Sequence, residues 1–187
     1  MFTFRQLPLI FTLLLPLTAS AHNFTTGQRV TPVGIVDKGE LLYQHDEFSY
    51  KNWNSAQLPG KVRVIQHIAG RSSSKVMNAA LIEAIKAAHL PRERYQTTTV
   101  VNTDDAIPGT GMFVRSSIEN NKKQFPWSQF IVDDNGAAKK AWGLEDGGSA
   151  IAVLDASGNV RFAKDGALTQ EEVKQVVALV RQLLKAP

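Results

Sequence analysis

Strand-like and helix-like segments alternate along most of this chain, and that alternation is the feature that most constrains its fold. Three runs rich in β-branched and apolar residues have the composition of buried strands: Val62–Ile68, Tyr95–Asn102 and Gln129–Val132. Between them, apolar residues at 77, 81, 84, 85 and 88 keep helical spacing until Pro91, and Phe113–Gln124 predicts a second helix. This order favours parallel strands in a sheet covered on both faces.

The last third of the chain predicts a short helix at Ala137–Trp142, then a β-hairpin and a final helix. Ala150–Leu154 and Val160–Ala163 flank a turn, which makes the predicted sheet mixed. Thr169-Gln170-Glu171-Glu172 is a capping box, a pattern in which two side chains satisfy backbone N–H groups at a helix start. The apolar residues that follow share one helical face: 173, 176, 177, 180, 183 and 184.

The segment before the first buried strand predicts a β-rich N-terminal extension. Val33–Val36 and Glu40–Tyr43 are strand-like, and Asp37-Lys38-Gly39 between them predicts a turn. Asn52–Pro59 is polar and favours turns. We therefore expect short strands here, joined by a tight turn, ahead of the alternating part of the chain.

Residues 1–21 have the pattern of a cleavable secretory signal peptide. Arg5 supplies a positive charge, Leu7–Leu17 is an uncharged apolar run, and Thr18-Ala19-Ser20-Ala21 is a small-residue cleavage site. An uncleaved anchor is the alternative, but a helix needs about 20 apolar residues to span a bilayer. We therefore predict export to the periplasm with cleavage after Ala21, which leaves residues 22–187 as a single domain.

The chain has no cysteine, which excludes thiol–disulfide exchange, thiol peroxidase chemistry and cysteine–zinc sites. Its formal net charge is +4, and the basic residues are interspersed with acidic ones, so the sequence predicts neither a nucleic-acid partner nor membrane attachment after cleavage. The four histidines are far apart and show no zinc spacing. We predict no cofactor and no metal.

The order of these segments, together with three local motifs, resembles the thioredoxin superfamily, especially its exported TlpA-like and peroxiredoxin-like branch. The motifs are the strand at Gly60–Ala69, the stretch Phe130–Asp133 with Ala141–Leu144, and the late hairpin from Ala150. The resemblance covers roughly residues 30–185. It implies a thioredoxin-like three-layer α/β/α sandwich with a central mixed sheet.

More narrowly, the whole chain resembles the YtfJ family of periplasmic proteins. Three stretches carry this resemblance: His67–Arg71, Asn102–Gly109 and Ala163–Glu172. In the register of the TlpA-like proteins, the two redox cysteines fall on Ser72 and Lys75, and the cis-proline beside the active site falls on Ser149. The resemblance therefore implies the scaffold without its redox chemistry.

The start of the first helix is the leading candidate for a ligand site. Free backbone N–H groups and the helix dipole favour anions there, and nearby side chains add charge and donors. Asp104 and Asp105 follow the next strand, at the edge where open α/β sheets tend to bind ligands. On a thioredoxin-like scaffold these segments and the late loop would meet. The candidate ligand-binding residues are Gly70, Arg71, Ser72, Ser73, Ser74, Lys75, Asp104, Asp105 and Ser149.

Three functional hypotheses remain open from the sequence, the third being a structural or chaperone-like partner of an envelope complex. The first is a non-catalytic binding or interaction module, whose partner is a periplasmic small anion or an envelope protein. The second is a cysteine-free hydrolase or transferase acting on an anionic substrate, with His67 as a base for Ser72. We also expect Trp127, Trp142 and Phe125-Pro126 to lie in the core or to form an exposed aromatic surface for a partner.

Overall fold

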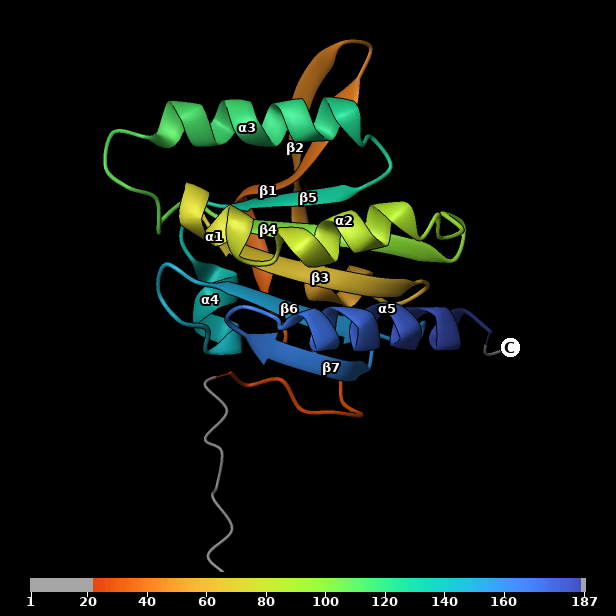
Figure 1. The fold of residues 1–187 in the computed structure, drawn as a ribbon. Helices are drawn as coiled ribbons and strands as arrows, with labels where there is room; N and C mark the ends of the chain where they lie inside the picture. The colour runs from red at the N-terminus through yellow and green to blue at the C-terminus, as the bar shows by residue number, and fades with distance from the viewer. Residues whose placement is uncertain (1–21, 186–187) are drawn as a thin grey trace, which may run out of the picture.

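Seven strands form one mixed sheet in the computed structural model, which describes residues 22–185 (Figure 1). Across the sheet they lie in the order β2 (Glu47–Asn54), β1 (Gly34–Gln44), β5 (Gln129–Asp133), β4 (Tyr95–Asn102), β3 (Val62–Ala69), β6 (Ser149–Leu154) and β7 (Val160–Asp165). The three central strands β3, β4 and β5 are parallel, and every other pairing is antiparallel. The predicted mixed sheet is confirmed.

Helices cover both faces of this sheet, as Figure 1 shows. One face carries α1 (Ser72–Met77), α2 (Ala79–Ala87), α3 (Gly111–Gln124) and α5 (Gln170–Lys185), and the other carries α4 (Ala137–Trp142). The segment before β1 lies beside α4, where the Asn23 N–H donates to the Trp142 carbonyl over 2.8 Å. The predicted three-layer α/β/α sandwich is therefore confirmed. Among the described residues, no helix combines the length and apolar character that spanning a membrane requires.

The core is divided among three clusters that follow the alternation of side chains along the strands. On the α4 face, Trp53 and Trp142 pack with Ile65 and Ile131. On the opposite face, α2 and α5 cover β3 and β6, and α3 covers β1, β4 and β5. On this face α2 packs beside α5 over β3 and β6, whereas α3 packs over β1, β4 and β5, so the two halves of the face have separate cores.

Three details of the sequence prediction are wrong. Asp37-Lys38-Gly39 is not a turn: β1 runs through it with a register shift between Ile35 and Glu40. Asn52–Asn54, expected to be turn-prone, ends the edge strand β2. The helix expected from Ser72 onward is interrupted at Asn78, which separates α1 from α2. The predicted signal peptide lies outside the described residues.

Candidate functional site

The first helix begins where β3, β4 and the loop before β6 meet. The Gly70 N–H donates to the Asn102 carbonyl over 2.8 Å, and the Ala69 N–H donates to the Gly148 carbonyl over 3.1 Å. A Cβ atom at Gly70 would lie 3.1 Å from the Ala106 Cβ and 3.2 Å from the Asn102 carbonyl oxygen. The strand end is therefore packed tightly between two neighbouring loops, and a residue with a side chain would crowd them.

Arg71 and Asp105 join these segments. The Arg71 Nε donates to the Asp105 carbonyl over 2.7 Å, and its Nη2 donates to the Asp105 carboxylate over 2.5 Å. The other carboxylate oxygen accepts the Gly147 N–H over 2.5 Å. One buried aspartate thus ties together three segments that are far apart in the sequence, and it neutralises the guanidinium predicted to face a ligand.

Ser74 and Ser149 are also engaged within the fold. The Ser74 hydroxyl donates to the Gly147 carbonyl over 2.7 Å, and the Asn78 amide donates to the Ser149 hydroxyl over 3.0 Å. Both serines are almost fully buried. The peptide bond before Ser149 is trans, as are all peptide bonds among the described residues. The position expected to carry the family's cis-proline therefore has an ordinary backbone here.

The remaining predicted site residues are exposed. Ser72, Ser73, Lys75 and Asp104 all reach solvent at the carboxyl edge of the sheet. The Lys75 ammonium extends to α3, where it donates to the Ser117 hydroxyl over 3.0 Å. The helix that Ser72 begins is only six residues long, and its N-cap residue Arg71 makes no side-chain capping bond. The predicted segments thus meet, but several of their polar groups already bind one another.

His67 and Ser72 do not form a catalytic pair. The His67 ring lies on the α4 face of the sheet, edge-on to Trp142 with ring centroids 6.4 Å apart. Ser72 lines the groove on the opposite face. Burial lowers the pKa of His67 to about 4, with the Lys139 ammonium adding to the effect. A neutral imidazole on the far face of the sheet cannot take a proton from the Ser72 hydroxyl.

A second polar cluster lies under α4, at the carboxyl ends of β3, β4 and β5. Asp133 caps α4 by accepting the N–H groups of Ala137 and Ala138 over 2.9 and 2.8 Å. Next to it, both polar atoms of the Asn102 side chain and the Nε2 of His67 are buried without a protein partner. Asn102 was not among the candidate site residues predicted from the sequence. No group of three or more acidic or histidine residues within 22–185 has the geometry of a metal site.

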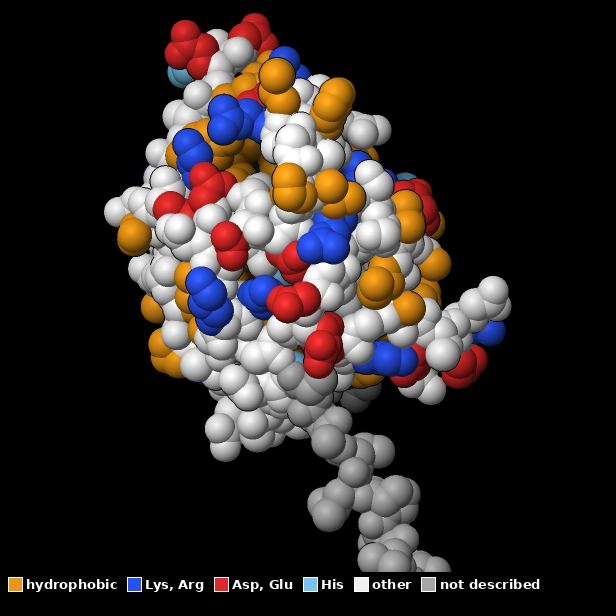
Figure 2. Space-filling model, turned by 90° about the vertical axis from the view of Figure 1, so that its left-hand side faces the viewer, with side chains coloured by type: hydrophobic (Ala, Val, Ile, Leu, Met, Phe, Trp, Pro, Cys, Tyr) orange, Lys and Arg blue, Asp and Glu red, His pale blue; other side chains and the backbone are white. Residues whose placement is uncertain are grey.

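A large groove opens beside the predicted site, between α2 and α3. Its volume is about 760 Å³, and Arg71, Ser72 and Lys75 line the end at α1. The volume falls in the range of small-molecule sites, which is roughly 300–1,000 Å³. Figure 2 looks onto the carboxyl edge of the sheet and shows charged side chains of both signs at its centre, with exposed hydrophobic side chains above them.

Sequence reasoning missed this groove, although two of its aromatic residues stood out as a candidate partner surface. Phe125 and Trp127 line its far end, and Trp127 is 44% exposed. Trp142, named with them, is fully buried in the α4 core. The apolar residues of Gly111–Gln124 carried a weak signal as well, because Phe113 and Val114 adjoin on a helix that has few other apolar residues.

Fold and site together define a thioredoxin-like α/β protein whose redox positions hold no thiol. Solved structures with this fold include a thiol-disulfide isomerase from Corynebacterium glutamicum (TM-score 0.58, 18% identity, covering 84% of this chain and 98% of that one). A Plasmodium vivax 2-Cys peroxiredoxin aligns with a TM-score of 0.55 and 13% identity, covering 86% of this chain and 99% of that one. At these identities the likeness concerns the fold alone.

The chain belongs to the family of bacterial proteins of unknown function designated YtfJ_HI0045, whose model matches residues 24–183. It is 66% identical to the uncharacterized protein YtfJ of Escherichia coli, covering 98% of this chain and all of that protein. It is also 44% identical to an uncharacterized protein of Haemophilus influenzae, covering 88% of this chain and 90% of the other. The resemblance to the YtfJ family is confirmed.

Proposed function

We propose that this protein is an exported, periplasmic binding module with no catalytic role, and that it takes a small anionic ligand at the start of α1. One observation carries the proposal. The redox positions of the fold hold Ser72 and Lys75, which stay exposed at the end of the α2–α3 groove, while the Arg71–Asp105–Gly147 contacts fix the backbone around them. A rigid, preformed face beside a groove suits binding.

The chemistry of this face supports binding over turnover. The chain has no thiol, and His67, the base predicted for Ser72, lies on the other face of the sheet. The Lys75 ammonium bonds a neutral serine hydroxyl, so an anion can displace that contact without breaking an ion pair. Arg71, already paired with Asp105, acts as a support for this face.

Thermal unfolding in the presence of phosphate, sulfate and small carboxylates tests the proposal, with chloride at equal ionic strength as the reference. A ligand at a hundred times its Kd stabilises the folded state by about 2.7 kcal/mol. We expect one of these anions to raise the Tm of the wild type and to have much less effect on Lys75→Ala. The matched control is Lys174→Ala, which removes a lysine whose side chain is 77% exposed on α5.

Equal responses in the two lysine variants would contradict the site at Lys75. A flat response to all anions would contradict a small-anion ligand, and crosslinking in cells would then test the alternative partner, an envelope protein.

Neither of these binding results tests export, which needs a separate measurement. Cell fractionation with N-terminal sequencing should find the protein in the periplasm beginning at His22, and an unprocessed cytoplasmic protein would contradict export.

A further inference from the structure

The groove between α2 and α3 is bounded by secondary structure on three sides. The two helices form its walls, and side chains of β3, β4 and β5 form its floor, among them Ile68, Val101 and Phe130. The α3 wall is 14 residues long, which corresponds to about 21 Å. The groove therefore extends along the sheet from the α1 end, where Lys75 lies, to the loop that carries Trp127.

Apolar side chains are exposed around this groove. Val76 is 67% exposed, Ile107 53%, Phe113 78% and Trp127 44%, and all four line it. Large exposed apolar residues that gather in one place on a monomer mark a binding surface. Below them, half-buried and buried residues such as Ile118 continue the apolar lining toward the sheet. The lining of the groove is thus mainly apolar, with polar residues such as Gln66, Thr97 and Thr99 among the apolar ones on its floor.

Charges along the groove are mostly positive. Its lining holds four basic residues, Arg71, Lys75, Lys86 and Arg92, but one acidic residue, Glu83. Three of these cations are already engaged: Arg71 with Asp105, Lys86 with Glu83 over 2.8 Å, and Arg92 on the Trp127 ring, 3.4 Å from its centroid. Lys75, bonded to the neutral Ser117 hydroxyl, is the cation most available to an anionic group.

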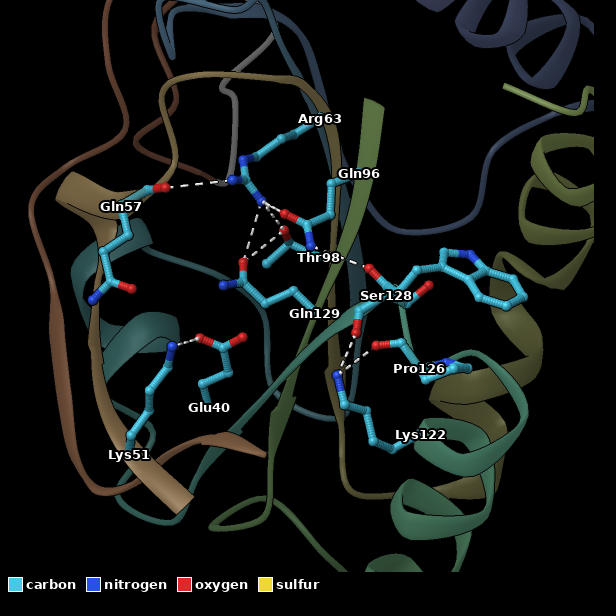
Figure 3. Close-up of polar contacts among 11 residues, drawn as sticks. Glu40, Lys51, Gln57, Arg63, Gln96, Thr98, Lys122, Pro126, Ser128 and Gln129 are labelled. Carbon is cyan, nitrogen blue, oxygen red and sulfur yellow. Dashed lines mark hydrogen bonds and ion pairs between the residues drawn. The ribbon is translucent and has the colours of Figure 1, made fainter. Parts of the chain in front are cut away.

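The far end of the groove is held in place by polar contacts, two of which come from the buried Lys122. Figure 3 shows Lys122 directed at the loop after α3, where its ammonium donates to the carbonyls of Pro126 and Ser128 over 3.1 and 2.8 Å. The Gln96 amide donates to the Trp127 carbonyl over 3.2 Å. Lys122 is 6% exposed, so these contacts fix the loop that presents Trp127. The aromatic end of the groove is thereby preformed.

We infer that the ligand is an amphiphile with one aliphatic chain and an anionic head group, in which the chain occupies the α2–α3 groove and Lys75 binds the head group. This inference rests on the proposed function, because it extends the anion bound at Lys75 into the groove. Charge complementarity favours an anion over a neutral or cationic amphiphile. The volume of about 760 Å³ favours a small molecule over a protein segment.

Titration of the purified protein with a series of alkyl carboxylates below their micellar concentrations tests this inference. Butanoate, octanoate and dodecanoate share one head group, and Trp127 is a built-in reporter because Trp53 and Trp142 are fully buried. Kd should fall by roughly tenfold for every two methylene groups that enter the groove. Trp127→Phe should lose most of the fluorescence change on binding, which identifies Trp127 as its source.

Dodecyl maltoside and a dodecanoyl lysophosphatidate complete the test of the head group. The neutral maltoside should bind at least tenfold more weakly than dodecanoate, and Lys75→Ala should remove that difference. The tighter of the two anions distinguishes a free fatty acid from a phosphate-bearing lipid as the source of the ligand. Equal binding of neutral and anionic amphiphiles would overturn the inference.

Variants at the exposed lining residues locate the chain. Phe113→Glu and Val76→Glu should each weaken dodecanoate binding by at least tenfold, and both residues are exposed enough for folding to be retained. Val36→Glu is the matched control, since Val36 is 72% exposed on β1 and does not line the groove. An equal loss in the control would overturn the assignment of the groove.

Failure of this inference is separable from failure of the proposed function. If phosphate or butanoate binds in a Lys75-dependent manner while dodecanoate binds no more tightly than butanoate, the groove inference falls and the anion site stands. If no anion of any chain length binds, both fall. If dodecanoate binds but Lys75→Ala binds it equally well, the head-group assignment and the anion site at α1 both fall.

Discussion

At the scale of single residues, several polar atoms are buried at the carboxyl ends of the strands without a hydrogen-bond partner in the protein. His67 is 3% exposed, and its Nε2 has no partner in the protein. Asn102, fully buried nearby on β4, leaves both its amide oxygen and its nitrogen unpaired. Groups of this kind cost stability unless water or a ligand satisfies them, and the cost for His67 depends on pH because its charged form is the more expensive to bury.

The pH dependence of the free energy of unfolding should reflect the protonation of His67. In the unfolded chain its pKa is near 6.5, whereas burial holds the folded value at about 4. The unfolded state therefore binds more protons between these two values. Above pH 6.5 the titration of His67 costs the folded state no stability. As the pH drops to 4, the free energy of unfolding should fall by about 3 kcal/mol. Urea unfolding of the wild type from pH 4 to 8 measures this.

His67→Gln should flatten the profile in that window, while His45→Asn, a change at an exposed histidine in the β1–β2 turn, should keep it. A His67→Gln profile as steep as that of the wild type would show that other groups set the acid sensitivity.

Arg63 is a buried cation held by neutral acceptors. Its Nε donates to the Leu58 carbonyl over 2.5 Å. Its Nη1 donates to Gln96 over 2.5 Å and to Thr98 over 3.0 Å (Figure 3). Burial lowers its pKa, and the charge of Glu40 opposes that effect. The planar guanidinium presents five N–H donors in a fixed fork, whereas an ammonium has only three on a single nitrogen.

Arg63→Lys should therefore destabilise the protein by about 2 kcal/mol, although it keeps the charge, because several buried acceptors lose their donor. Arg161→Lys is the control: Arg161 is 46% exposed by its side chain, and its change should stay within about 0.5 kcal/mol. Urea midpoints of both variants measure the difference. Equal midpoints would mean that the shorter ammonium side chain reaches the same acceptors as the guanidinium.

At the scale of elements, Asn78 explains why one predicted helix is two. Its side-chain oxygen accepts the Leu168 N–H over 2.9 Å, and its amide donates to the Gly166 carbonyl over 3.1 Å and to Ser149. These contacts link α1 and α2 to the loop before α5. Periodicity in the sequence reports the helical spacing on both sides of Asn78, but the tertiary contacts that interrupt the helix are invisible to it.

Asn78→Ala should cost about 3 kcal/mol, even though alanine has the higher helix propensity, because it leaves the Leu168 N–H and the Gly166 carbonyl without their partner. Chemical denaturation measures the loss. Asn120→Ala, at an exposed position on α3, should change stability by less than about 0.5 kcal/mol. A stabilised Asn78→Ala would show that propensity outweighs these contacts.

Local sequence motifs predicted an element correctly where the motif is typical of only one kind of structure. The capping box of α5 is present: the Glu172 N–H donates to the Thr169 hydroxyl over 3.2 Å, and the Glu172 carboxylate accepts the Thr169 N–H over 2.6 Å. Gly39 shows the opposite case. Its φ of 79° suits a turn or a bulge, and here a β-bulge lets β1 continue. A Cβ there would collide with the Lys51 carbonyl oxygen on β2.

At the scale of the whole molecule, the sequence predicted that three segments would meet but not what they would do to one another. The family resemblance placed Gly70–Lys75, Asp104–Asp105 and Ser149 on one face, and the structure brings them together. That Asp105 would neutralise Arg71 could not be predicted, since it depends on the path of the loop after β4. The α2–α3 groove could not be predicted either, because it arises from how two helices are spaced on the sheet.

Asp105→Asn tests how this face is held together. Asp105 is 8% exposed, and its carboxylate binds both Arg71 and the Gly147 N–H. Loss of the charge should cost about 2 kcal/mol of stability, since hydrogen bonds to charged groups contribute about 1.5–3 kcal/mol.

The same change releases the Arg71 guanidinium beside Lys75, so the Tm of Asp105→Asn should rise more with added phosphate than that of the wild type. The double variant Arg71→Ala/Asp105→Asn should lose this extra rise. If Asp105→Asn responds to phosphate no more than the wild type does, other contacts keep Arg71 from binding the anion, and Asp105 then stabilises the fold with no influence on the anion site.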